Sequence, residues 1–270
     1  MADSAGRVIA NSLDRLGKAA VTQLEEFGYF LGLTIESLYW LLLGRFRRQP
    51  VRLPAAAQQM VEIGIAGLPI VFVLSFAIGV MLAIQGIHTL KQFGAETQVV
   101  LGIALSVTRE FGPLITGILV AGRSGSALAA RIGTMNVNQE IDALRVMGIN
   151  PVRYLVSPVL LAMLIMLPLV TLFSDLAALL GGAVFCNLEL GLSYAAYWDQ
   201  STSFLKANDV LQGLGKSLVF ALIISLVGVA NGFMVTGGAE GVGRYTTRAV
   251  VLSISYIVIA DMMFTYFLNR

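Results

Sequence analysis

Apolar residues run through this chain in long blocks that are separated by shorter polar stretches. A transmembrane helix needs about 20 mostly apolar residues. Five blocks reach this length, at about 63–87, 99–121, 154–185, 217–236 and 249–268. The third is too long for one upright helix and too short for two helices with a loop, so we predict one long helix that tilts or protrudes, with Pro168 as the site of any bend. The pattern therefore predicts an all-α protein with five membrane-spanning helices.

Two weaker segments precede the first block. Residues 6–24 place apolar side chains near helical spacing with charged residues between them, which is typical of an amphipathic helix at a membrane interface. Residues 27–43 are richer in aromatic side chains and contain Glu36. This second segment is compatible with a place in the interface, partial entry into the membrane or a full span. We accordingly divide the chain into an interfacial N-terminal region, 1–52, and a five-span membrane domain, 53–270.

Composition agrees with a membrane protein and excludes several kinds of site. The chain is 57% hydrophobic and 13% charged, with a mean hydropathy of +0.80, whereas a soluble domain has about 25% charged residues. A net charge of +2, with no basic run interleaved with aromatics, argues against nucleic-acid binding. The single cysteine, Cys186, excludes an internal disulfide and a cysteine-based metal cluster, and the single histidine, His88, excludes a His-rich metal site. We expect no cofactor in this chain.

The arginines indicate how the chain is oriented. They gather in the segments 45–52, 123–153 and 244–248, which fall on one side of the predicted membrane. The loops of the opposite side carry lysines, at positions 91, 206 and 216. Because positive charge is enriched in cytoplasmic loops, the distribution predicts a cytoplasmic N-terminus and a C-terminus on the outer side.

Two adjacent charges, Arg109 and Glu110, interrupt the second apolar block. A charge within a bilayer-length helix is costly, so it usually faces a protein interior or a wet cavity. Neighbouring residues on a helix point about 100° apart, so each of the two needs its own partner. Lys216, Asp261 and a second subunit are the candidates. The pair either braces the helices or lines a path, and the sequence leaves both open.

Two further features of the blocks concern packing. Small residues at 121, 125 and 129 give the spacing that lets helix backbones approach closely, either within one subunit or at a dimer seam. Asp175 lies toward the outer end of the third block, where we expect it to reach headgroups or water.

The polar segment 134–150 stands between the second and third blocks. Val137, Ile141, Leu144 and Met147 recur in it at helical spacing, and Gly148 is a suitable stop. The pattern predicts a short amphipathic helix at about 134–148. Its apolar face packs either against the ends of its own spans or into a groove of a partner protein.

Several sequence motifs resemble one family. REFGP at 109–113, AGRSGSALAARIGTM at 121–135, EIDALRVMGINP at 140–151 and LVSP at 155–158 look like the MlaE/YrbE family, the permease subunits of ABC-type lipid transport systems associated with MCE proteins. TTRAVV at 246–251 and Asp261 add to the likeness, which covers about residues 55–268.

The resemblance implies a homodimer of five-span subunits in the inner membrane. It implies that 134–148 is a coupling helix that enters a cleft of a cytoplasmic ABC ATPase, where ATP and Mg²⁺ bind, and that an MCE-domain protein is the periplasmic partner. A small STAS-type accessory protein fits the same system. The implied function is movement of phospholipid between the inner membrane and the MCE-type partner, which maintains the lipid asymmetry of the outer membrane.

The same resemblance assigns roles to particular residues. Those of the lipid cavity, near the ends of spans one and two, are Leu82, Gln85, Phe93, Arg109 and Glu110. Those that contact the ATPase are Glu140, Ile141, Asp142, Leu144 and Met147. The charges themselves, independently of the resemblance, predict a buried charge network with Lys216 and Asp261.

Other functions fit the sequence less well. Gly215-Lys216-Ser217 imitates the end of a phosphate-binding loop, but Val210 stands where the first glycine belongs. Residues 122–125 match the GxSG motif of rhomboid-type proteases, yet the only histidine, His88, precedes the serine and lies at the opposite face. We therefore expect no enzymatic activity. The remaining alternative is an ion-coupled secondary transporter, although the chain shows no internal repeat of the kind such folds carry.

Overall fold

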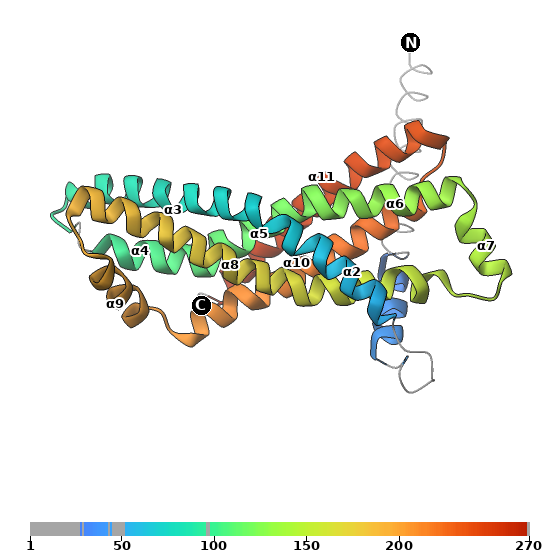
Figure 1. The fold of residues 1–270 in the computed structure, drawn as a ribbon, viewed down its shortest axis with the longest axis horizontal. Helices are drawn as coiled ribbons and strands as arrows, with labels where there is room; N and C mark the ends of the chain where they lie inside the picture. The colour runs from blue at the N-terminus through green and yellow to red at the C-terminus, as the bar shows by residue number, and fades with distance from the viewer. Residues whose placement is uncertain (1–27, 29, 43, 45–51, 96–97, 269–270) are drawn as a thin grey trace, which may run out of the picture.

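The computed structural model describes residues 28, 30–42, 44, 52–95 and 98–268, and the regular elements in these ranges are all helices (Figure 1). Five of the helical stretches are long and apolar enough to cross a membrane. The prediction of an all-α membrane protein with five spans is therefore confirmed. The amphipathic pattern predicted at 6–24 lies outside the described residues.

The spans are built from helices that join end to end. The first span consists of α2 (Leu53–Ile63), a 3₁₀ turn (Ile65–Gly67) and α3 (Leu68–Lys91). The second span consists of α4 (Val99–Ser106), α5 (Gly112–Val120) and α6 (Ser126–Val137). Its three helices are joined by π-helical turns at Val107–Phe111 and Ala121–Gly125. The third is a π-helical turn (Val152–Val156) with α8 (Ser157–Leu190); the fourth and fifth are α10 (Ala207–Phe233) and α11 (Gly238–Leu268). The short helices α7 (Glu140–Val146) and α9 (Tyr194–Phe204) connect spans, and a further helix covers Phe30–Leu42.

The first three spans are longer than predicted. Each covers 39 residues, which corresponds to about 58 Å at a rise of about 1.5 Å per residue. The hydrocarbon core of a bilayer is only about 30 Å thick, so these helices extend beyond it. The predicted boundaries were wrong because hydropathy marks where apolar residues stop, whereas the helices continue into polar and small residues. We call the two ends of the bundle the α7 end and the α9 end (Figure 1).

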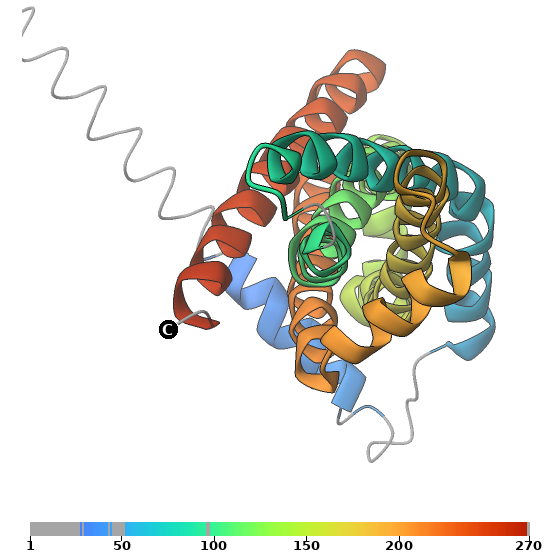
Figure 2. The same ribbon diagram turned by 90° about the vertical axis from the view of Figure 1, so that its left-hand side faces the viewer.

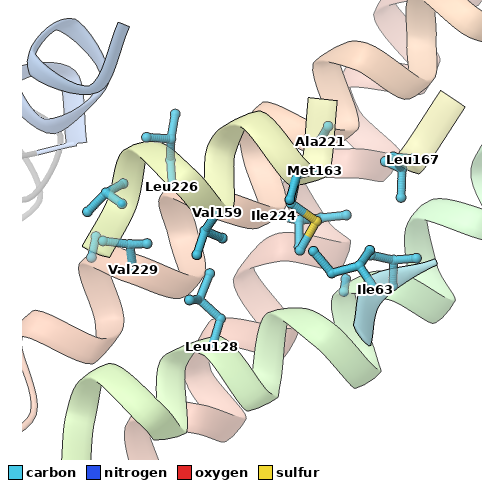
Figure 3. Packing of buried hydrophobic residues seen from close by; sticks show 14 of the residues in the cluster. Ile63, Leu128, Val159, Met163, Leu167, Ala221, Ile224, Leu226 and Val229 are labelled. Carbon is cyan, nitrogen blue, oxygen red and sulfur yellow. The ribbon is translucent and has the colours of Figure 1, made fainter. Parts of the chain in front are cut away.

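The fourth span lies at the centre of the bundle and the fifth at its edge. In the most apolar window of α10, 67% of the residues are buried, against 11% in α11. The larger hydrophobic core joins Ile224 and Val229 of α10 to Leu128 of α6 and to Val159 and Met163 of α8 (Figure 3).

A second, smaller core lies at the α9 end. It packs Ile103 of α4 and Cys186 of α8 around Tyr197 of α9, whose side chain is fully buried. Burial raises the pKa of the Tyr197 hydroxyl well above its ordinary value, so this group stays neutral. The α9 helix is thereby held against the spans.

Backbones approach most closely between α3 and α8. A Cβ atom on Gly79 would overlap the carbonyl oxygen of Ala178, and one on Gly181 would overlap that of Phe76. Beside this contact the hydroxyls of Ser75 and Ser174 lie 2.7 Å apart. Small residues and buried hydroxyls of this kind hold helices together in lipid, where the hydrophobic effect between helices is absent. They fix α3 on α8 although most of α3 is exposed.

The small residues of the second span also pack inside this chain. Ala121 and Ala129 are fully buried, and Gly125 lies against Ile224 of α10. On the facing helix, a Cβ on Gly228 would lie 3.1 Å from the Gly125 carbonyl oxygen. The interpretation of this stripe as packing within one subunit is confirmed.

The helix Phe30–Leu42 runs across the bundle at the α7 end (Figures 1 and 2). It is too short to span a bilayer. Leu33 and Ser37 are buried, whereas Leu31 and Ile35 are exposed, so one side faces the bundle and the other faces outward. This arrangement agrees with a helix that lies in the interface.

Candidate functional site

The two adjacent charges of the second span lie on a π-helical turn. Arg109 and Glu110 belong to the turn Val107–Phe111, which joins α4 to α5 immediately before Pro113. A proline has no N–H to donate and its ring crowds the preceding turn. The wider π turn leaves room for that ring without ending the helix, and such turns often occur at functional sites. From this turn the side chains of Arg109 and Glu110 point to different partners.

Glu110 faces a lysine that is almost fully buried. Its Oε2 accepts a hydrogen bond from Lys216 Nζ at 2.6 Å, and Asp261 Oδ1 of α11 lies 2.9 Å from the same nitrogen. The Thr265 hydroxyl accepts from Lys216 Nζ at 3.1 Å and lies 3.0 Å from both carboxylate oxygens of Glu110. The Lys216 side chain is 2% exposed, compared with 31% for Glu110. A buried ammonium is stable only with such partners.

Arg109 turns to a different partner, Asp209. Both its Nε and its Nη2 donate to Asp209 Oδ1, at 2.9 Å and 2.5 Å. The other carboxylate oxygen, Oδ2, accepts the backbone N–H of Lys206 at 2.9 Å, where α10 begins. Arg109 is thus tied to the N-terminus of α10, a contact that the sequence analysis missed because Asp209 stands outside the apolar blocks.

These five charged residues form one charge cluster, defined here as Arg109, Glu110, Asp209, Lys216 and Asp261. It joins the second span to α10 and α11 and contains two positive and three negative groups. Arg109 is ten residues from the start of the second span at Val99, or about 15 Å along the helix axis. The cluster therefore lies in the α9 half of the bundle rather than at its middle.

A groove opens between α3 and α4 toward the α9 end. It has a volume of about 310 Å³ and is lined by Leu82, Gln85, Gly86, Thr89, Leu90, Val99, Gly102, Ile103 and Ser106. Leu82 and Gln85, two of the predicted cavity residues, are in its wall. Phe93 lies beyond the end of α3, 77% exposed and outside the groove. Arg109 follows Ser106 by about one helical turn, so the charge cluster lies just beyond the inner end of the groove.

Asp175 does not reach headgroups or water, and that prediction is wrong. Its side chain is buried, and Oδ1 has no hydrogen-bond partner among the described residues. A Cβ on Gly112 would overlap that oxygen, so the carboxyl group packs directly on the backbone that follows the π turn. The prediction followed hydropathy along the chain, whereas the side chain points across to the second span.

The predicted helix at 134–148 is two elements. Residues 134–137 belong to α6, which ends before Gln139; α7 covers only Glu140–Val146. Gln139 adopts the left-handed conformation, with φ of 59°, which stops one helix before the next begins. Gly148, with φ of 74°, follows the end of α7, and Ile149 N–H donates to Leu144 O at 2.9 Å, so the predicted stop is confirmed.

The residues predicted to contact the ATPase divide between two faces of the α7 region. Ile141 and Leu144 are 1% and 8% exposed and pack on their own chain, so the packing interpretation holds for them. Glu140, Asp142 and Met147 are exposed, and Asp142 pairs with Arg145 at 3.0 Å. Sequence reasoning passed over Val146, which is 90% exposed at the tip.

The loop after α7 is bound to the N-terminal helix. Asn150 Nδ2 donates to Glu36 Oε1 at 2.7 Å, and Asn150 Oδ1 accepts from the backbone N–H groups of Val152 and Arg153. The Arg153 guanidinium lies 5.6 Å from the centre of the Trp40 ring. The helix Phe30–Leu42 and the α7 region are therefore connected by specific polar contacts.

The geometry also excludes the roles suggested by the two enzyme-like motifs, a phosphate-binding loop and a serine protease site. Gly215-Lys216-Ser217 lies inside α10, with its lysine in the charge cluster, and cannot form a phosphate-binding loop. Ser124 is 25 residues along the second span from Val99, or about 38 Å, whereas His88 is in the last turn of α3 at the α9 end. The described residues contain no group of three metal-ligating side chains.

Comparison with known proteins agrees with this architecture. The chain is 33% identical to a probable ABC transporter permease protein of Rickettsia typhi, over 97% of this chain and 100% of that protein. It is 30% identical to the intermembrane phospholipid transport system permease protein MlaE of Haemophilus influenzae, over 96% and 97%. It is 34% identical to protein TRIGALACTOSYLDIACYLGLYCEROL 1, chloroplastic, of Arabidopsis thaliana, over 87% and 67%. The family model of the permease MlaE matches residues 56–267, and the chain belongs to this family.

Proposed function

We propose that this protein is the membrane subunit of an ATP-driven transporter that moves phospholipid between the inner membrane and an MCE-type periplasmic partner, and so maintains outer-membrane lipid asymmetry. The names of the Rickettsia and Haemophilus relatives, an ABC transporter permease and a phospholipid transport permease, support this proposal. The chain itself supplies passage and coupling, and a separate ABC ATPase binds ATP and Mg²⁺.

The observation that carries the proposal is the form of α7. Its buried residues, Ile141 and Leu144, fix it to the spans, while Asp142, Val146 and Met147 are presented to the outside. A helix anchored on one face and exposed on the other transmits a push from a partner to the spans. Exposed apolar side chains at the end of a bundle are also typical of a protein contact. We assign this surface to the cytoplasmic ATPase.

The remaining partners follow from that orientation. With the α7 end cytoplasmic, the N-terminus is cytoplasmic and the C-terminus periplasmic, and the MCE-type protein approaches the α9 end. The outer faces of α3 and α11 are largely exposed in the single chain, which suits contact with lipid and with a second copy. In the homodimer we place the lipid cavity between the two subunits, with Leu82, Gln85 and Phe93 at its wall. A small STAS-type protein would bind on the cytoplasmic side.

In this proposal the charge cluster is the polar part of the lipid path. Glu110 and Arg109 are the two members with substantially exposed side chains, at 31% and 35%. They lie just beyond the inner end of the groove, where a lipid headgroup meets its first fixed charges. Lys216 and Thr265 hold Glu110 in place, and Asp261 pairs with the same lysine.

The test uses the full chain expressed with its ATPase and MCE-type partners. Met147→Asp puts a charge into the proposed apolar contact, and we expect loss of ATPase co-purification and of ATP-dependent phospholipid transfer between vesicles. Leu188→Asp, at an apolar side chain of similar exposure near the α9 end, is the matched control and retains the ATPase. ATPase binding that survives Met147→Asp would contradict the assigned surface. Transfer that needs an ion gradient and no ATP would instead favour the secondary transporter, with the charge cluster as its coupling site.

A further inference from the structure

A second groove lies at the α7 end, on the opposite half of the bundle from the charge cluster. It consists of two adjoining pockets between α2, α6 and α8, with volumes of about 160 Å³ and 220 Å³. Both pockets are lined by Gln59, Arg131 and Val159, so they adjoin along these three residues, and we treat them together as one groove. Neither the coupling surface nor the charge cluster uses it.

The outer part of this groove is basic. Arg52 and Arg131 line it together with Gln58, Gln59 and Tyr154. The Arg52 guanidinium stacks on the Tyr154 ring, 4.2 Å from its centre, and Arg131 Nη2 donates to Gln59 Oε1 at 3.1 Å. Among the residues that the structure describes, neither arginine forms a salt bridge. Both are therefore held in place by neutral groups, with their charge available to an anion.

The inner part of the groove is apolar along its floor. Ile63, Leu128, Val159 and Met163 line it, and Figure 3 shows their side chains between α6 and α8. Glu62 lines this part only, and its carboxylate accepts from Gln59 Nε2 at 3.3 Å. The groove thus changes from basic to apolar as it runs from the end of the bundle toward its middle.

The depth of the groove matches the boundary of a bilayer. Arg131 is six residues before the end of the second span at Val137, or about 9 Å from that end. The span exceeds the hydrocarbon core by about 28 Å in total, about 14 Å at each end if it is centred. Arg131 then lies at the level of the lipid headgroups, and the apolar floor reaches from there to the edge of the hydrocarbon.

We propose that this groove binds an anionic phospholipid of the surrounding leaflet, with its phosphate between Arg52 and Arg131 and the start of an acyl chain on the apolar floor. Basic pockets between membrane helices are suited to such headgroups. A phosphate free in solution shares the headgroup chemistry but makes no use of the floor. The site is separate from the proposed transport path and does not depend on the proposed function.

The experiment is native mass spectrometry of the detergent-solubilised full chain, titrated with phosphatidylglycerol or phosphatidylcholine of the same acyl chains. We expect the wild type to retain one phosphatidylglycerol per chain about tenfold more tightly than phosphatidylcholine, since the positive ammonium of choline offsets the attraction between the phosphate and the two arginines. The double variant Arg52→Gln/Arg131→Gln loses this preference. The matched double variant Arg145→Gln/Arg244→Gln removes two exposed arginines outside the groove and keeps it.

A second variant separates the groove from general charge attraction. Ala127→Trp fills the inner part at an exposed position and leaves both arginines in place, and we expect it to lose the bound phosphatidylglycerol. Equal retention of the two lipids by the wild type would overturn the proposal, as would undiminished preference in the double variant or in Ala127→Trp. Displacement by millimolar inorganic phosphate would also overturn it, in favour of a site for a free anion.

Discussion

The charge cluster and α7 are both polar interruptions of an apolar chain, yet they are organised in opposite ways. In the charge cluster every charged side chain meets an oppositely charged partner from another part of the same chain. In α7 the only ion pair with a described residue, Asp142 with Arg145, lies within the helix itself, and the tip is apolar and exposed. The cluster is complete in a single chain, whereas the surface of α7 is not.

This difference follows from the two surroundings, which are lipid hydrocarbon for the charge cluster and water for α7. A charge at hydrocarbon depth must be paired inside the protein, because lipid offers no hydrogen bonds. A polar side chain at the end of the bundle can hydrogen-bond to water instead. Residues there can therefore remain exposed and contact a partner protein. The cluster should therefore respond to substitution mainly in stability, and the α7 tip mainly in binding.

The largest effect is expected for Lys216→Met. The substitution leaves Glu110 and Asp261 facing each other at a site where the lysine was almost fully buried. Breaking a buried ion pair by removing one partner costs about 3–5 kcal/mol. We expect a loss of this size in the free energy of unfolding, measured in detergent. In the triple variant Lys216→Met/Glu110→Gln/Asp261→Asn most of the loss is recovered; a triple variant as unstable as the single one would show that the lysine acts through packing and not charge.

The next effect contrasts the two faces of the α7 region. Ile141→Ala removes a side chain that is 1% exposed and belongs to the larger core, so it should lower the free energy of unfolding by about 2–4 kcal/mol. Val146→Ala, at a position that is 90% exposed, should change it by less than about 0.5 kcal/mol. Thermal unfolding of both variants in detergent provides the measurement. Similar losses in the two would mean that the tip is packed in the free chain.

The number of spans was predictable because a bilayer requires contiguous apolar residues, and each block of sufficient length became a helix. Their ends were not predictable in the same way. The segment 121–133 is rich in Gly, Ala and Ser, so hydropathy ends the second apolar block at 121, yet the helix continues because those small residues let it pack tightly on α10. The left-handed turn at Gln139 could not be predicted, because the residue with positive φ is not a glycine.

The partners within the charge cluster were also only partly predictable from the sequence. Lys216 and Asp261 could be named as partners of Glu110 because few other charges stand in apolar blocks. Asp209 could not, since it follows a polar connection and its value as a partner depends on where α10 begins. Thr265 is one of many hydroxyls, and only the fold shows that it bridges Lys216 and Glu110.

Within the charge cluster, the smallest effect on stability is expected for Glu110→Gln, and this variant is also the most discriminating. The cluster holds one more negative than positive charge, so Lys216 keeps Asp261 as its counter-ion after the change. The amide oxygen of glutamine can still accept from Lys216 and from Thr265, so the free energy of unfolding should change by under about 1 kcal/mol.

If Glu110 acts in the lipid path, the same variant should nevertheless lose most of its ATP-dependent phospholipid transfer, because the negative charge itself is what the headgroup meets. Glu189→Gln is the matched control: it makes the same change at an exposed carboxylate near the end of α8, outside the charge cluster, and should leave transfer largely intact. A Glu110→Gln protein that transfers lipid normally would assign the cluster to bracing alone. One that unfolds as readily as Lys216→Met would do the same, because the charge would then be required by the fold before any lipid reached it.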